Sequence, residues 1–342
     1  MSSISPLTYQ DLPHYPGEDL SSAAVLRAKE NIPKSETVTF TEGVTWFRWF
    51  NQSQDNNNSE VTPIIISIGG TGTAIFYNTF ASKVANLYNG PVLIYDRFNM
   101  GLSDRIETQY NGCALWFSQL DQLLDSDAVG LKGKQVHFCT FSLATNILLP
   151  YAARHSERIR SVAFLSGGIG GGSPFHQQRM RKMSKTFSKI RCFCCCFSSS
   201  IITRAVQKKV IPSLYERCEH QVMEGGDPVG LPVAKAMYRV KGFASKFVEQ
   251  MMENIVFDTI FNGAADECVK LAETKMPVYA RNYMQDQEVD HEKFARVWDI
   301  LKEGNELSRF ELKEGEHHKF YIDDTADTLV HFFQESNRQN FQ

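Results

Sequence analysis

Short runs of apolar, β-branched residues recur through the first half of the chain. These runs cover residues 63–70, 91–97, 136–142 and 162–168. Strands that are buried on both faces of a parallel sheet have this composition, because neither face meets water. Segments of helical periodicity separate the runs, at about 74–88, 111–126 and 143–155. The alternation of strand and helix predicts a doubly wound, mostly parallel α/β sheet.

The alternation stops at about residue 172 and resumes near the C-terminus. The later elements are strands at 277–283 and 309–315, a helix near 291–303 and a final helix from about 324. The interruption, 173–270, has helical periodicity and contains no run typical of a core strand. We therefore predict one core made of residues 1–172 and 271–342, with 173–270 as a helical insertion. Upstream, the β-branched and aromatic residues of 37–51 are split by Glu42 and Gly43, which predicts a hairpin.

Composition narrows the class of protein. The chain has 342 residues and a formal net charge of −3, which gives no case for nucleic-acid binding. No apolar run has the length of a membrane span, and the polar N-terminus does not resemble a signal peptide. Four of the eight cysteines crowd at 192–196, which suits neither a disulfide framework nor a zinc site. We expect a cytoplasmic protein without a metal or organic cofactor.

One serine stands where chemistry is expected. Ser142 ends the apolar run 136–142 and precedes a predicted helix, with the small residues Thr140 and Ala144 two positions to either side. A sharp strand-to-helix turn of this kind exposes a nucleophilic hydroxyl and needs small neighbours. The backbone amide of Leu143 then points at the same place from a helix N-terminus.

Further segments give this serine a context. "IGGTG" (68–72) is similar to an oxyanion loop, "YDRFNMGLSDR" (95–105) to an Asp-x-x-Gly-x-Gly-x-Ser stretch, and "YAARHSERIRSVAFLSG" (151–167) to a helix and sixth strand. In this order and spacing, the segments resemble the α/β-hydrolase family. The resemblance implies the α/β-hydrolase fold, with the insertion as a helical lid after the sixth strand. The family pattern is altered at Ile68, Thr71 and the "FNMG" of 98–101.

The resemblance also implies a catalytic triad in the order Ser, Asp, His. It places the acid at Asp286, with Glu288 and Asp290 as neighbouring alternatives. It places the base at His317, with His318 as the alternative. The histidine would take the proton of Ser142, and the aspartate would fix its tautomer. Backbone amides of Leu143 and Gly70 would form the oxyanion hole.

The insertion has an unusual charge pattern. No Asp or Glu occurs between Arg158 and Tyr215. Within 179–201, basic residues alternate with apolar residues at the spacing of one helix face, which include Met183, Phe187 and Ile190. A cationic amphipathic helix suits an anionic membrane surface, and its cysteines suit S-acylation. The same helix could bind a calmodulin-like partner or simply cover the active site.

The leading hypothesis is a serine hydrolase that cleaves a carboxylic ester, with a hydrophobic acyl group carried on Ser142. The oxyanion loop also resembles that of proline iminopeptidases, which makes an aminopeptidase acting on a small amide the alternative enzyme. A catalytically silent binding protein with this fold is the alternative from another class, since Ile68 and Thr140 replace family residues.

Overall fold

The computed structural model describes residues 36–51, 61–70, 73–104, 106, 112–182, 214–231, 233–234, 262–317 and 319–339. At its centre lies an eight-stranded sheet in the order β1-β2-β4-β3-β5-β6-β7-β8. The strands are β1 Glu36–Thr39, β2 Val44–Phe50, β3 Ile64–Ser67, β4 Val92–Tyr95, β5 Val136–Phe141, β6 Ile159–Leu165, β7 Val278–Tyr283 and β8 Arg309–Lys313.

Strands β3 to β8 are parallel, and the hairpin is the antiparallel part. β3 lies between β4 and β5, with Ile64 opposite Val92 on one side and His137 on the other. β1 and β2 pair with each other in antiparallel fashion, and β2 pairs in the same way with β4. The predicted hairpin and the mostly parallel sheet are therefore confirmed. The central strands β3, β4 and β5 are buried along their whole length, as continuous apolar runs require.

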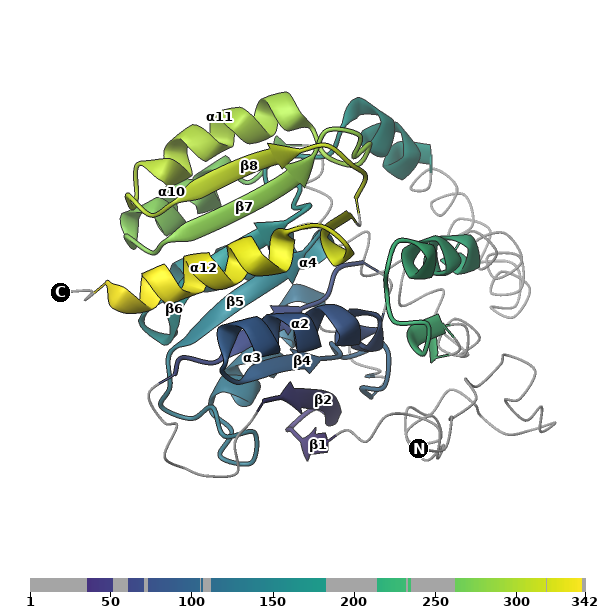
Figure 1. Cartoon of the computed structure of the whole chain (residues 1–342), viewed down its shortest axis with the longest axis vertical. Helices are drawn as coiled ribbons and strands as arrows, with labels where there is room; N and C mark the ends of the chain where they lie inside the picture. The colour runs from purple at the N-terminus through teal and green to yellow at the C-terminus, as the bar shows by residue number, and fades with distance from the viewer. Residues whose placement is uncertain are drawn as a thin grey trace, which may run out of the picture.

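Helices cover both faces of the sheet (Figure 1). They are α2 Asn78–Tyr88, α3 Gly112–Leu124, α4 Leu143–Arg154, α10 Ala265–Glu273, α11 His291–Lys302 and α12 Thr325–Arg338. Helices α2 and α12 pack on one face and contribute to one apolar core, which includes Phe80 and Phe333. The other four pack on the opposite face, around a core that includes Leu149 and Leu271.

Helix α10 was not predicted as a separate element. Its apolar face is small, yet Cys268 and Leu271 are fully buried in the second core. Gly263, two residues before the helix, has φ +78° and leaves no room for a Cβ atom against the backbone of Gly170. Two loops thus meet closely at the start of α10, a contact that no local sequence pattern indicates.

Parts of the predicted insertion are described. Residues 174–182 and 214–223 are helical, and their side chains Arg179 and Arg217 pair with Glu288 in the loop that follows β7. Asp227 donates its backbone N–H to the carbonyl of Phe76 (2.9 Å), after β3. Most of the predicted cationic helix, including Met183, Phe187 and Ile190, lies outside the described residues, as does the cysteine cluster at 192–196. No helix in the described part of the chain is long and apolar enough to cross a membrane.

The turn after β4 is organised by one carboxylate. Asp96 is fully buried, and its Oδ2 accepts the backbone N–H of Leu102 (2.8 Å). Its Oδ1 accepts the N–H of Ala74 (2.6 Å), from the loop that follows β3. Gly101 passes so close that an added Cβ atom would lie 2.0 Å from Asp96 Oδ2. Asp96 is therefore hydrogen-bonded to two loops and leaves no room for a side chain at position 101.

Replacement of Gly101 by alanine should be severely destabilising. Its φ of +44° is unfavourable for any side chain, and the new methyl group would displace the Asp96 carboxylate. We expect the free energy of unfolding to fall by roughly 3 kcal/mol or more, as strain and overpacking add. Urea unfolding measures this. Gly133→Ala is the matched control, because Gly133 has φ +73° with open space around it, and it should lose about half as much. Equal losses in the two variants would contradict this account.

Candidate active site

Ser142 occupies a strained turn between β5 and α4. Its φ is +48° and its ψ −121°, a conformation that non-glycine residues rarely adopt. The backbone N–H of Ser142 donates to the carbonyl of Leu165 on the neighbouring strand (3.0 Å), which holds the turn against β6. The side chain is partly exposed. Helix α4 begins at the next residue, so the Leu143 amide lies at a helix N-terminus beside the serine.

The residues around this turn explain how a threonine fits there. Thr140 is fully buried, and its Oγ1 lies 3.1 Å from Thr145 Oγ1 and 3.3 Å from the carbonyl of Ala163. Its hydroxyl is therefore hydrogen-bonded, and its bulk lies between strand and helix. Ala144 is 1% exposed. The β-branched residue at this position is compatible with the sharp turn.

The loop after β3 runs directly against Ser142. A Cβ atom on Gly69 would lie 2.7 Å from the carbonyl oxygen of Phe141 and 2.9 Å from Ser142 Cβ. Only glycine allows this approach. Gly70 follows with φ +27° and has open space where a side chain would be. Ile68, which stands where the family has histidine, is fully buried in the core. Thr71 and Gly72 lie outside the described residues.

A buried arginine lies behind this loop. Arg97 is 1% exposed, and its Nη2 donates to the carbonyls of Gly70 (3.0 Å) and Gly69 (3.4 Å). Its guanidinium carbon lies 4.4 Å from the centre of the Trp116 ring. Sequence reasoning missed this residue, although it stands within the segment 95–105 that was singled out. The pattern of that segment says nothing about which loop the side chain reaches.

An acid and an imidazole meet in the loops after β7 and β8. His317 Nδ1 lies 2.6 Å from Asp286 Oδ2, with the Asp286 side chain fully buried and that of His317 17% exposed. The other carboxylate oxygen, Asp286 Oδ1, accepts the backbone N–H of Glu288 (2.8 Å). The structure thus brings together the residues predicted as acid and base. His318 lies outside the described residues.

The two alternative acids have other partners. Glu288 Oε1 forms ion pairs with Arg179 (3.2 Å) and Arg217 (2.5 Å), which belong to the helical segments 174–182 and 214–223. Asp290 is the N-cap of α11, where its Oδ1 accepts the N–H of Lys293 (3.1 Å). The carboxylate of Asp286 is therefore the one that faces the imidazole through a hydrogen bond.

The charges around His317 favour its protonated form. Burial lowers the pKa of His317, but Asp286 and then Glu288 outweigh it, and the pKa is raised to about 9. Burial raises the pKa of Glu288, yet Arg217, His317 and other cations overcome this and lower it well below its usual value. The pKa of the neighbouring His176 is lowered mainly by burial, and the same charged residues act on it more weakly. The carboxylates of Asp286 and Glu288 therefore raise the pKa of His317, and Arg217 acts in the opposite direction.

Ser166 is a second residue that the sequence did not single out. It follows β6, is 1% exposed and has φ +48°. Its Oγ donates to the backbone carbonyl of His317 (2.6 Å), and its N–H donates to that of Arg281 (2.8 Å). The end of β6 is thereby tied to the loop that carries the histidine. The positive φ of Ser166 and its hydrogen bond to a distant loop cannot be recognised from the sequence.

One cluster of side chains has the residue types of a metal site. Ligand atoms of His220, Glu224 and Glu316 lie within 4.8 Å of one another. His220 and Glu224 are four residues apart and form an ion pair (3.3 Å), with the His220 side chain largely exposed. We interpret this cluster as a surface ion pair with a neighbouring carboxylate.

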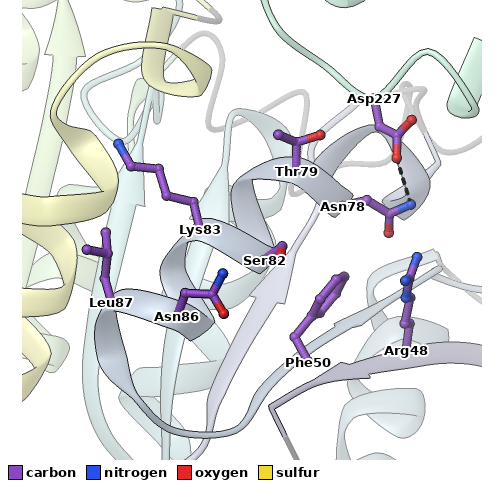
Figure 2. A pocket seen from close by; sticks show the side chains of 9 residues that line it. All are labelled: Arg48, Phe50, Asn78, Thr79, Ser82, Lys83, Asn86, Leu87 and Asp227. Atoms are coloured by element: carbon purple, nitrogen blue, oxygen red, sulfur yellow. Dashed lines mark hydrogen bonds between the residues drawn. The ribbon is translucent and has the colours of Figure 1, made fainter.

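A pocket of about 620 Å³ lies elsewhere, along the outer face of α2 (Figure 2). It is lined by Arg48, Phe50, Asn78, Thr79, Ser82, Lys83, Asn86, Leu87 and Asp227. Asn78 donates from Nδ2 to Asp227 Oδ2 across one end (3.0 Å), and Lys83 pairs with Asp327 of α12 (3.1 Å). None of the predicted site residues lines this pocket.

The raised pKa of His317 predicts a pH profile. If the imidazole must be neutral to act as a base, kcat/KM should increase with pH through about 9. The ion pair between His317 and Asp286 also contributes to the stability of the fold. This contribution is fully present below the unfolded pKa of about 6.5 and is lost as pH rises through about 9. Glu288→Gln removes a negative charge and leaves Arg217 uncompensated, so both changes should lower the apparent pKa. Rates of turnover between pH 6 and 10 measure this apparent pKa.

Asp290→Asn is the control for this profile, because Asp290 carries the same charge but caps α11. It should leave the apparent pKa where it is. An unchanged or higher value in Glu288→Gln would show that Glu288 does not act on the imidazole. The other charged or titratable groups that act on the site, Arg217, His176 and Glu224, are the same in both variants.

Comparison with known proteins gives a fold and no close relative. No family model matches the chain, and no curated sequence does. Solved structures do match. One is an α/β hydrolase from a Medee basin deep-sea metagenome library (TM-score 0.60, 17% identity, 90% of this chain and 100% of that one). Another is an enol-lactonase from Burkholderia xenovorans LB400 (TM-score 0.55, 15% identity, 87% of this chain and 100% of that one). A third is a structure reported with carboxylesterases of Nitrososphaera gargenis (TM-score 0.55, 14% identity, 89% of this chain and 99% of that one). With its sheet order and strand-to-helix turn, the chain has the α/β-hydrolase fold.

Proposed function

We propose that this protein is a serine hydrolase that cleaves a carboxylic ester through an acyl-enzyme on Ser142. The observation that carries the proposal is the buried Asp286 carboxylate at 2.6 Å from the His317 imidazole. This pair lies in loops after β7 and β8, and Ser142 follows β5. Because the carboxyl ends of parallel strands meet at one edge of a sheet, serine, histidine and aspartate share that edge.

Each residue has a definite task in the reaction. His317 Nε2 accepts the proton of Ser142 Oγ as the oxygen attacks the ester carbonyl carbon. The protonated imidazole then gives that proton to the departing alcohol, which leaves the acyl group on Ser142. Water repeats the sequence, releases the acid and restores the serine. Asp286 keeps Nδ1 protonated throughout, so that Nε2 is the free base.

Negative charge develops on the carbonyl oxygen in both steps. The Leu143 amide, at the N-terminus of α4, supplies one donor. The Gly70 amide supplies the second, since Gly69 brings its loop against Ser142. Two donors held rigidly before the reaction cost no reorganisation during it.

The choice of ester over amide rests on the proteins of similar fold. The enol-lactonase and the carboxylesterases act on ester-type bonds, as their names state. One observation favours the aminopeptidase alternative. Glu224 lies in the segment after helix 214–223, 18% exposed at its side chain, and His317 acts on its pKa, which burial raises. A carboxylate there could bind a free amine.

Labelling with a fluorophosphonate probe tests the nucleophile. Wild-type protein should be labelled on Ser142, and Ser142→Ala should lose both labelling and turnover, because the probe requires an activated serine. Mass spectrometry of the labelled peptide identifies the residue. Ser82→Ala, in the pocket along α2, is the control and should label normally.

A folded wild-type protein without labelling would favour the silent binding protein. Turnover of a prolyl arylamide well above that of nitrophenyl esters would favour the aminopeptidase. Esters of several acyl lengths, assayed side by side with the amide, distinguish these results from the proposed esterase.

Asp286→Asn tests the acid. The amide keeps the size of the carboxylate but can present its NH₂ group to Nδ1 and stabilise the wrong tautomer. By analogy with other triads, kcat should fall by about 10⁴-fold. Asp290→Asn should stay within about threefold of wild type, since Asp290 caps α11. Similar losses in the two variants would remove Asp286 from the triad.

A further inference from the structure

The Gly69–Gly70 segment has little to define its own conformation. Gly69 must be glycine because Phe141 and Ser142 leave no space for a Cβ atom. Gly70 has φ +27°, a region where glycine is at ease. Two consecutive glycines allow the intervening peptide to rotate at little cost. The direction of its N–H must therefore be imposed by neighbouring side chains.

Arg97 supplies such a contact. Its Nη2 donates to the Gly70 carbonyl at 3.0 Å and to the Gly69 carbonyl at 3.4 Å. The guanidinium is held in place by the Trp116 ring at 4.4 Å, and Trp116 packs on Ile147 of α4. Both the arginine and the tryptophan are 1% exposed. Hydrogen bonds to a buried charged donor are stronger than those between neutral groups.

The geometry of the peptide bond gives this contact a consequence. The carbonyl of Gly69 and the N–H of Gly70 belong to one planar trans peptide, so they point in opposite directions. A guanidinium that binds the Gly69 carbonyl therefore turns the Gly70 N–H away from Arg97.

The other end of the loop is fixed by the residue next to Arg97. Asp96 accepts the N–H of Ala74 at 2.6 Å and the hydroxyl of Thr73 at 3.1 Å. Adjacent residues of one turn thus bind the loop at both ends, one through carbonyls and one through donors.

We propose that Arg97 is a positioning residue of the oxyanion hole, which holds the Gly69–Gly70 peptide with its N–H directed to the developing oxyanion. This rests on the proposed function, because it assigns a role within the same site. Arg97 touches no substrate. It acts through the backbone amide of Gly70, and its effect belongs to the transition state instead of substrate binding.

Arg97→Met tests the proposal, since methionine keeps much of the bulk and removes every donor. The expected result is a fall in kcat of about 10²-fold, the size seen when one oxyanion donor is lost, with KM changed less than about threefold. The affinity for a boronic acid, which forms a tetrahedral adduct on serine, should fall in parallel with kcat. Rates are expressed per folded molecule, with the folded fraction measured by circular dichroism.

Arg160→Met is the matched control. Arg160 also donates to backbone carbonyls, those of Ser336, Asn337 and Gln339, but at the start of β6. Its loss should lower Tm and leave kcat within about threefold of wild type. Arg97→Lys gives a second variant, with one ammonium group in place of the guanidinium, and should fall between wild type and Arg97→Met.

The outcomes separate this proposal from the proposed function. Wild-type turnover with kcat and boronic acid affinity unchanged in Arg97→Met would overturn the role of Arg97 and leave the hydrolase in place. If Arg97→Met does not fold, Arg97→Lys decides: a loss of tenfold or more in kcat supports the role, and a value within threefold of wild type overturns it. A wild-type protein that neither labels nor turns over esters refutes the proposed function itself.

Discussion

The close approach of the Gly69 backbone to Ser142 is the constraint on which the site depends. It requires a residue without a side chain at position 69 and a serine with φ +48° at position 142. Such a conformation persists only where the surroundings enforce it. Here the enforcement comes from the hydrogen bond to Leu165 on β6 and from helix α4, which begins at the next residue. The strand order places β5 between β3 and β6, so that Ser142 can contact Gly69 after β3 on one side and Leu165 of β6 on the other.

Buried polar groups fix the loops that surround this turn. Asp96 ties the end of the loop after β3 to the turn after β4, and Ser166 ties the end of β6 to the backbone of His317. Each group is almost fully buried and hydrogen-bonded. Breaking such a bond leaves an unsatisfied polar atom in the core, so these contacts define loop conformation more sharply than apolar packing would.

Charge connects the acid loop to the segments that precede and follow 183–213. The backbone N–H of Glu288 donates a hydrogen bond to the Asp286 carboxylate. The Glu288 side chain forms ion pairs with Arg179 and Arg217. The two arginines come from helical segments far apart in the sequence. The attraction between the Glu288 carboxylate and the two arginines offsets the cost of removing that carboxylate from water. Without the carboxylate, two like charges would lie together. The position of these segments and the protonation of His317 are thus coupled through one residue.

The sequence by itself determined the sheet, the hairpin and the position of the serine, because these depend on local periodicity and on the small residues of one turn. Continuous apolar runs specify strands that are buried on both faces, as β3, β4 and β5 are. The resemblance to a known family supplied Asp286 and His317, and the structure places them in contact.

Tertiary structure alone decided which polar groups meet. Arg97 reaches a loop 27 residues away in the chain, and Ser166 a carbonyl 151 residues away. Whether Glu288 faces the imidazole or the arginines depends on where two helical segments lie over the sheet. Helix α10 buries Cys268 and Leu271 in the second core, and the loop before it passes close to Gly170 at Gly263. Local patterns record which face of an element is apolar, whereas these contacts depend on side-chain direction and on space between distant segments, which no local pattern encodes.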